Sequence, residues 1–328
     1  MGKEGNMKHI FFGGSLENEK LIMNDLTNKS NVKIIYRDNA LNSKILSKLF
    51  NIHMSQSLNR HIKLPLKKLW FKKLIDNDFT KNETIVFTFV GGWFNRELFS
   101  WLRKNYPNCK QVLFLRDTVN IYEKTIPSFK GGILNDVFDL VISSNPDDCS
   151  KFGFKYSPVF ISKIKEENLV KYPKSDFVFI AIAKDRLQLI HKLYEKFTAF
   201  GYKCDFYITK VKDEDRKYPD GIHYAENHLK YKDYLGREVA SKCIIELIKG
   251  DTQGGTFRHW EAVYYNKKLI SNWKGIKDFK FYDERYMLYF EDVDDIDINF
   301  FKENLDVDYH YNGENSPVNL PVFIENNL

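Results

Sequence analysis

Short, continuously apolar segments that alternate with helical patterns limit most strongly what this chain can fold into. The segments are rich in β-branched and aromatic residues and predict strands at His9–Phe12, Val32–Tyr36, Thr84–Phe89, Gln111–Leu115, Leu140–Ser143, Phe177–Ala183, Cys204–Thr209, Gly221–Tyr224, Cys243–Leu247, Lys268–Ser271 and Met287–Phe290. Continuous apolar character is typical of parallel strands that are covered on both faces. Residues 185–200 carry an apolar stripe at helical spacing and predict a crossover helix. The alternation therefore predicts an α/β fold with parallel sheets.

The pattern is interrupted between Lys155 and Pro173, where two prolines and a charged run separate one α/β series from the next. A chain of 328 residues has the length of about two domains. We therefore expect two Rossmann-like domains, residues 1–160 and residues 161–328. Ligands of open α/β sheets bind outside the carboxyl ends of the strands, so we expect the two sheets to face a central cleft that holds the ligand.

Charge and cysteine content narrow the class of protein. Residues 1–160 carry 24 basic and 15 acidic side chains, whereas the remainder carries 26 and 29, so the two halves differ in sign. The net charge of +6 is too mild to indicate a nucleic-acid partner. The four cysteines form no C-x-x-C pair, and no apolar run approaches the ~18 residues of a membrane span. The first residues contain no apolar signal segment, so we expect a cytoplasmic protein.

The most informative stretch is Cys243–Asn272, which predicts a strand, a glycine-containing loop, a helix and a second strand. Glycines permit close approach of a ligand, and the free N–H groups of a helix N-terminus favour phosphate. Glu261, about one and a half turns into the helix, is placed to accept hydrogen bonds from two vicinal ribose hydroxyls. A capped surface helix with a solvated Glu261 is the alternative. The loop residues that begin this site are Gln253, Gly254, Gly255 and Thr256.

Three cations are expected near this loop. Lys184 and Arg186 follow the strand Phe177–Ala183, and cations at a strand tip can reach a diphosphate, an arginine with two hydrogen bonds. Arg258 lies two residues into the helix that follows the glycines. The alternatives are a solvated turn capped by Asp185 and an exposed helical arginine.

At residues 254–272 the chain reads G-G-T-F-R-x-x-E-A-V-x-Y-x-K-K-L-I-S-N, and at residues 145–160 it reads N-P-D-D-C-S-K-F-G-F-K-Y-S-P-V-F. Both runs resemble GT-B glycosyltransferases of bacterial lipopolysaccharide and capsule clusters, and the resemblance extends from about Thr84 to Phe290. Many retaining members have two glutamates separated by seven residues here, of which the second binds the nucleotide ribose. That position matches Glu261, whereas the first falls on Gln253, a departure from the pattern. In the family, cations near Lys184 and Arg186 replace a metal on the leaving diphosphate.

The strand ends of the first half are expected to serve the acceptor. Arg116 and Asp117 follow Gln111–Leu115, and a carboxylate at a strand tip can take a proton from an acceptor hydroxyl. A helix cap with an ion pair is the alternative. Two other strands end in glycines, and Trp93 either stacks on a sugar or packs in the core. The glycines are Gly13, Gly14 and Gly92.

Together these features predict a metal-independent glycosyltransferase of the hexosyltransferase type. It would transfer a sugar from a nucleotide-diphosphate sugar to a glycan or lipid-linked acceptor in bacterial surface polysaccharide synthesis. A UDP-sugar is the first candidate for the donor. The predicted catalytic residues are Asp117, Lys184, Arg186 and Gln253. The predicted donor-binding residues are Gly254, Gly255, Thr256, Arg258 and Glu261. The predicted acceptor-side residues are Gly13, Gly14, Gly92, Trp93 and Arg116. No cofactor or metal is expected. A catalytically silent nucleotide-sugar or glycan-binding subunit and a sugar-nucleotide epimerase remain open as alternatives.

Residues 60–75 contain six lysines and arginines and no acid. Ile62, Leu66, Leu69, Trp70 and Leu74 fall near one helical face. A basic amphipathic helix with a tryptophan suits an anionic membrane surface, which would make the protein peripheral at the inner face of the cell membrane. A core-packing helix with a solvated basic back is the alternative.

Overall fold

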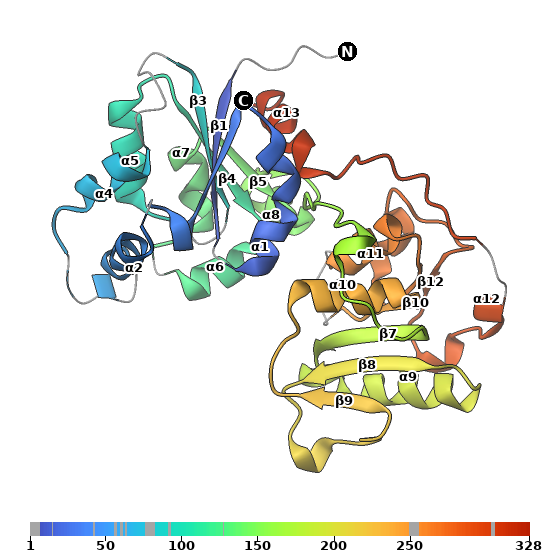
Figure 1. The fold of residues 1–328 in the computed structure, drawn as a ribbon. Coiled ribbons are helices and arrows are strands. Elements are labelled where there is room, and N and C mark those ends of the chain that lie inside the picture. The colour runs from blue at the N-terminus through green and yellow to red at the C-terminus, as the bar shows by residue number, and fades with distance from the viewer. Residues whose placement is uncertain are drawn as a thin grey trace. The chain divides into compact units, whose positions relative to one another are not determined.

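The computed structural model describes residues 7–14, 16–41, 43–55, 58–59, 62, 64–75, 83–90, 93–126, 128–248, 256–302 and 306–328 (Figure 1). The chain divides into two compact units. The first unit comprises Met1–Ser162 and Glu314–Leu328, and the second comprises Lys163–Gly313. Each unit contains one six-stranded sheet, and every described strand pairing is parallel. The predicted α/β class with two parallel, Rossmann-like sheets is confirmed.

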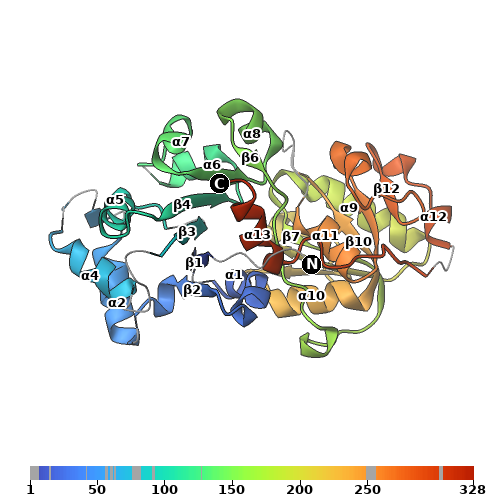
Figure 2. The same ribbon diagram turned by 90° about the horizontal axis from the view of Figure 1, so that it is seen from above.

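The sheet of the first unit has the strand order β2-β1-β3-β4-β5-β6. Its strands are β1 (Lys8–Gly13), β2 (Val32–Tyr36), β3 (Ile85–Val90), β4 (Lys110–Leu115), β5 (Leu140–Ser143) and β6 (Lys155–Tyr156). Its helices are α1 (Glu17–Ile22), α2 (Lys44–His53), α4 (Lys67–Leu74), α5 (Arg96–Asn105), α6 (Val119–Thr125), α7 (Leu134–Val137), α8 (Pro146–Phe152) and α13 (Leu320–Glu325). Figures 1 and 2 show α4 and α5 on one face of the sheet and α1 and α13 on the other.

The apolar strands form the core of the first unit because both of their faces are covered. Every residue of β3 is buried. Phe89 of β3 stacks on Phe12 of β1 with ring centroids 4.8 Å apart, and the ring of Phe99 of α5 lies 4.7 Å from it. Burying one such ring stabilises the fold by about 1.5–3 kcal/mol. These contacts hold β1 and β3 side by side at the centre of the sheet.

The sheet of the second unit has the strand order β12-β11-β10-β7-β8-β9. Its strands are β7 (Ser175–Ile182), β8 (Cys204–Thr209), β9 (Ile222–Ala225), β10 (Ser241–Glu246), β11 (Lys268–Ser271) and β12 (Met287–Tyr289). Its helices are α9 (Leu187–Ala199), α10 (Tyr231–Ala240), α11 (Phe257–Tyr264) and α12 (Asn299–Lys302). The chain leaves the central strand β7 toward β8 and later returns to its other side at β10. The strand order therefore reverses between β7 and β10, as it does between β1 and β3 in the first unit.

Every strand predicted from the sequence is present, with ends within two residues of the prediction. The two-residue strand β6 was not predicted, because so short a segment has no periodicity. Residues 187–199 form the expected crossover helix α9.

The C-terminal residues 314–328 belong to the first unit, and the prediction that all of residues 161–328 form the second domain is corrected there. The reason is α13, which packs on the first sheet: Nε2 of His9 on β1 lies 2.8 Å from Oε1 of Glu325. A six-residue helix does not reveal in its sequence which of two sheets it covers.

Candidate functional site

Arg186 lies at the carboxyl edge of the second sheet, at the point where the strand order reverses. Its Nη2 donates a hydrogen bond to the carbonyl of Ile182 at the end of β7 (2.7 Å), and its Nη1 donates to the carbonyl of Leu247 just after β10 (2.5 Å). Burial lowers the pKa of Arg186, and the nearby charge of Arg258 acts in the same direction. A guanidinium group has five N–H donors, so this arginine ties the two strand ends together and still keeps donors for a ligand.

Arg258 comes to the same place from α11. Its Nη2 donates to the carbonyl of Ile180 on β7, and its guanidinium carbon lies 5.8 Å from the centre of the Tyr234 ring. Burial opposes its charge, but Tyr234 and Glu238 outweigh that effect and raise its pKa. The two arginines predicted as donor-site cations are thus both anchored on main-chain carbonyls of β7.

Lys184, the third predicted cation, lies directly after β7. It is exposed, and its φ of 49° places it in the left-handed region. A residue with a Cβ pays roughly 1–2 kcal/mol for this conformation. Such conformations gather at ligand sites, where the surrounding structure holds them in place.

The start of α11 is fixed by a buried carboxylate that was not among the predicted site residues. Oε1 of Glu246, at the end of β10, accepts hydrogen bonds from the backbone N–H of Thr256 (2.8 Å) and from its hydroxyl (2.6 Å). Oε2 accepts from the Ser271 hydroxyl at 2.8 Å, and Nδ1 of His259 lies 3.5 Å from Oε1. Burial raises the pKa of Glu246, but these donors outweigh it and lower the pKa overall. The sequence signal that could have indicated this residue is a single acid in the otherwise apolar segment Cys243–Leu247.

Thr256 is the N-cap of α11, since its Oγ1 accepts from the N–H of Arg258 at 3.2 Å. Its own N–H and O–H both go to Glu246 and are not available to a phosphate. The other predicted loop residues, Gln253, Gly254 and Gly255, lie outside the described residues.

Glu261 is buried, with 1% of its surface exposed, so the solvated surface carboxylate is wrong. Its Oε1 accepts from the Tyr231 hydroxyl at 2.8 Å and its Oε2 from the Tyr234 hydroxyl at 2.7 Å. Glu238, also on α10, is equally buried; burial and the charge of Glu261 raise its pKa well above the ordinary value. Ribose binding by Glu261 stays a prediction, and it requires the two tyrosine hydroxyls to give way. This cluster joins α10 and α11, and the sequence of neither helix alone indicates that these residues meet.

In the first unit, the glycine turn after β1 is filled by the carboxylate of Glu19. A Cβ placed on Gly14 would lie 1.7 Å from Glu19 Oε2, so any larger residue there would displace this carboxylate. Arg116 Nη2 donates to Glu19 Oε1 at 2.7 Å, and the Leu16 N–H donates to Oε2 at 3.2 Å. The predicted residues Gly14 and Arg116 thus meet around an acid that the sequence analysis did not name.

Trp93 is buried, and its Nε1 donates to the carbonyl of Gly13 at 2.6 Å. The centre of its ring lies 5.0 Å from the centre of the Phe12 ring, so Trp93 packs in the core. Asp117 is exposed after β4, and Gly92 lies outside the described residues.

Within the described ranges, no three or more histidine, cysteine, aspartate or glutamate side chains gather as a metal site would require. None of the helices in the described part of the chain is long and apolar enough to cross a membrane.

Comparison with known proteins finds similar structures at low sequence identity. No family model and no curated protein sequence matches the chain. The glycotransferase of kitacinnamycin is 9% identical with a TM-score of 0.49, and the match covers 99% of this chain and 100% of that one. Trehalose-6-phosphate synthase OtsA is 11% identical with a TM-score of 0.45, covering 80% and 84%. The spinosyn forosaminyltransferase SpnP is 11% identical with a TM-score of 0.42, covering 98% and 100%.

Proposed function

We propose that the protein is a glycosyltransferase whose second unit binds a nucleotide-diphosphate sugar, with a UDP-sugar as the first candidate. The observation that carries the proposal is the anchored pair Arg186 and Arg258 at the strand-order reversal of the second sheet. Ligands of open α/β sheets bind at this kind of position. Two arginines and the exposed Lys184 supply positive charge there, which suits a diphosphate.

The chemistry that follows is electrostatic. When the bond between the anomeric carbon and the diphosphate oxygen breaks, negative charge grows on the leaving diphosphate. Arg186 is already held by two carbonyls, so its remaining N–H groups stabilise that charge without first reorganising. Lys184 adds a flexible cation. No step in this scheme uses a metal.

Asp117 is proposed as the general base that takes the proton of the acceptor hydroxyl. Its carboxylate is exposed at the carboxyl end of β4, beside Arg116. The proposed acceptor is a glycan or lipid-linked glycan of bacterial surface polysaccharide synthesis.

Incubation with radiolabelled UDP-, GDP-, TDP- and CMP-sugars tests the activity. Slow hydrolysis of one donor is the expected result, with faster consumption of that donor by transfer when an acceptor glycan is added. Inversion at a ring carbon would identify an epimerase instead, and binding without turnover a silent subunit. Turnover is expected to persist in excess EDTA; loss that manganese or magnesium restores would overturn the metal-free scheme.

Membrane attachment is the second part of the proposal, with a surface that differs from the predicted one. Leu66 is left-handed, with φ 63°, so α4 begins only at Lys67 and the described residues 64–66 are not part of this helix. Leu74 is buried in the core. Lys67, one of the six basic residues in the segment 60–75, is buried and pairs with Glu97 at 2.8 Å.

The exposed apolar side chains instead span α4, the residues before it, and α2. They are Ile45, Leu46, Leu49, Ile52, Ile62, Leu66 and Leu69, and we call them the apolar face. The two helices adjoin, because Trp70 Nε1 donates to Nδ1 of His53 at 2.6 Å and the Trp70 and Phe50 rings lie 6.0 Å apart. Exposed lysines accompany this face: Lys44, Lys48, Lys68, Lys72 and Lys73. Apolar side chains among lysines suit an anionic lipid surface.

Sedimentation with vesicles tests this surface. Wild-type protein should bind vesicles that contain anionic lipid, and binding should fade as salt rises. Changing Ile45, Leu49 and Ile52 together to serine should abolish binding and leave donor hydrolysis intact. The matched control is Ile121→Ser, which changes an exposed isoleucine of α6 outside the apolar face. Failure of wild-type protein to bind anionic vesicles at low salt would refute membrane attachment.

A further inference from the structure

A pocket of about 420 Å³ lies at the opposite edge of the second sheet, where its strands begin. The first residues of β7, β10 and β11, which are Ser175, Ser241 and Lys268, stand at or beside it. Pockets of this size hold small molecules. The eight residues of β7 span about 25 Å at roughly 3.3 Å per residue, so this pocket is distinct from the Arg186 site.

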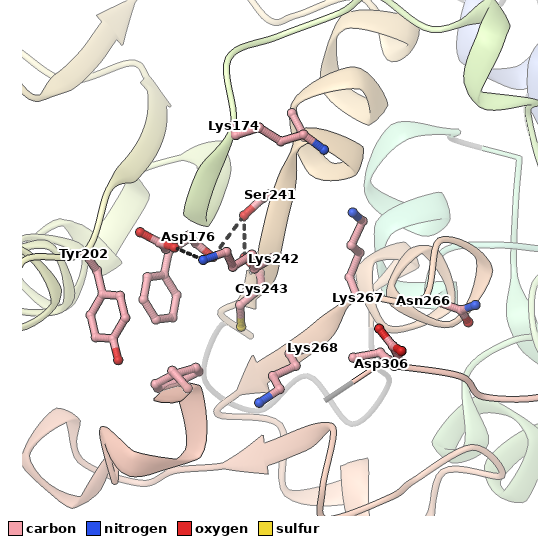
Figure 3. Close-up of a pocket in the computed structure, with 14 residues that line it drawn as sticks. Lys174, Asp176, Tyr202, Ser241, Lys242, Cys243, Asn266, Lys267, Lys268 and Asp306 are labelled. Atoms are coloured by element: carbon pink, nitrogen blue, oxygen red, sulfur yellow. Dashed lines mark hydrogen bonds and ion pairs between the residues drawn. The ribbon is translucent and has the colours of Figure 1, made fainter. Parts of the chain in front are cut away.

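The walls of the pocket carry more positive than negative charge (Figure 3). The charged lining residues are Lys174, Lys242, Lys267, Lys268, Asp176 and Asp306, four cations and two anions. Lys242 pairs with Asp176 at 2.8 Å. The pocket therefore holds a surplus of lysine charge beyond that pair, which favours an anionic occupant.

Two of these lysines are held in place by the main chain. Lys267 Nζ donates to the carbonyl of Val239, and Lys268 Nζ donates to the carbonyl of Phe300, each at 2.6 Å. An ammonium group has three donors, so Lys267 is positioned by this bond and has further donors that can bind an anion. Burial lowers the pKa of Lys267, opposed by Glu166, and Lys174 lowers it further. An anion between Lys174 and Lys267 would relieve this repulsion.

Aromatic rings form another part of the lining. The Phe177 ring meets Tyr202 at 5.3 Å and Phe301 at 4.7 Å, both edge-on, and Tyr202 and Phe301 are partly exposed. Figure 3 shows Tyr202 across the pocket from Lys267. The pocket thus offers ring surfaces on one side and ammonium groups on the other.

We propose that this pocket binds a small phosphate compound that carries a planar ring. Its ring lies against Tyr202 and Phe301, and its phosphate is held by Lys174 and Lys267. The site is independent of the proposed glycosyl transfer, because it uses the amino edge of the sheet rather than the carboxyl edge.

Calorimetry with phenyl phosphate tests this proposal on the full chain. Phenyl phosphate should bind at least tenfold more tightly than inorganic phosphate, which has no ring, and than phenol, which has no charge. Lys174→Glu and Lys267→Met should each raise the dissociation constant at least tenfold. Because Lys174 is exposed, Lys174→Glu should fold, and it tests the proposal even if Lys267→Met does not fold.

Two matched controls locate the ligand. Lys171→Glu makes the same charge change three residues from Lys174 but outside the pocket, and it should alter the constant less than twofold. Lys184→Ala, at the other edge, should have no effect. The proposal is overturned if phenyl phosphate binds no better than phosphate, if Lys171→Glu matches Lys174→Glu, or if Lys184→Ala abolishes binding.

Discussion

The two units contain similar sheets, but the arginines near their strand-order reversals have different partners. In the first unit, Arg116 pairs with the carboxylate of Glu19, which packs against Gly14 in the turn after β1. In the second unit, Arg186 and Arg258 donate to main-chain carbonyls, and no ion pair joins either arginine to another described residue. A carboxylate cancels the charge of an arginine, whereas the carbonyls that hold Arg186 leave its charge in place. Arg258 lies in addition near the buried carboxyls of Glu238, Glu261 and Glu246, which favour its charged form. The second unit is therefore the one prepared for an anionic ligand.

The comparison shows that a shared topology does not assign a binding site by itself. Both sheets offer a reversal point at the carboxyl ends of their strands. The side chains decide which of the two can hold a diphosphate. Variants that exchange or remove these side chains test the difference.

The largest expected effect is on stability, from Glu246→Ala. The change leaves the Thr256 N–H and hydroxyl and the Ser271 hydroxyl without their buried acceptor, so we expect a loss of about 3–5 kcal/mol. Glu19→Ala, the counterpart in the first unit, should cost about 1 kcal/mol, because its side chain is 19% exposed and water can replace it. Hydrogen exchange along a urea titration measures each unit separately. Equal losses would contradict the structural role of Glu246.

The next effect is on nucleotide binding, from Arg186→Ala. Losing charged hydrogen bonds worth about 1.5–3 kcal/mol should weaken binding of the donor nucleotide roughly 10- to 100-fold and remove turnover. Arg116→Ala makes the same change in the first unit and should leave nucleotide affinity within about twofold. Calorimetry on both variants, with circular dichroism to confirm folding, decides between them. If Arg116→Ala weakens binding as much as Arg186→Ala, the contrast between the units fails.

One buried group in each unit, Glu238 in the second and His9 in the first, should respond to pH with opposite signs. The pKa of Glu238 is raised in the fold above its unfolded value of about 4.3, so its contribution to stability is complete below that pH and lost as pH rises through the folded pKa. Burial lowers the pKa of His9, against the opposing effect of Glu325. The stability from neutral His9 is therefore present above about pH 6.5 and lost as pH falls toward its folded pKa.

Glu238→Gln tests the second-unit part of this contrast. The variant should gain about 1–2 kcal/mol over wild type at pH 9 and little at pH 4, and only in the second unit. Hydrogen exchange corrected for intrinsic rates reports this gain for each unit. A pH dependence that is the same with and without Glu238 would show that this carboxyl does not titrate as described.

The smallest effect is expected from Glu261→Gln. If Glu261 turns from its tyrosines to a ribose, the neutral side chain should weaken nucleotide binding by about 1 kcal/mol, roughly fivefold. Glu238→Gln is the control, since it makes the same change in the same cluster. Unchanged affinity in Glu261→Gln would remove this residue from the nucleotide site.

The sequence predicted the strands, the two parallel sheets and the cations after β7, because these depend on local apolar runs and on residues at strand ends. The sequence did not predict the partners of those cations. Arg186 reaches a carbonyl 61 positions away, and Arg116 meets an acid 97 positions away. The return of residues 314–328 to the first unit and the position of Lys67 against Glu97 have the same cause. Contacts between distant segments leave no periodic signal, so only the folded chain shows which charges are cancelled.

Hydrogen exchange with and without a saturating nucleoside diphosphate tests the central claim most directly. The nucleotide is the one that gives the largest thermal shift among UDP, GDP and TDP. We predict increased protection in residues 183–187 and 256–259 of the second unit and no change in residues 13–19 and 115–119 of the first. Protection confined to the first unit, or absent from both segments of the second, would contradict the assignment of the diphosphate to Arg186 and Arg258.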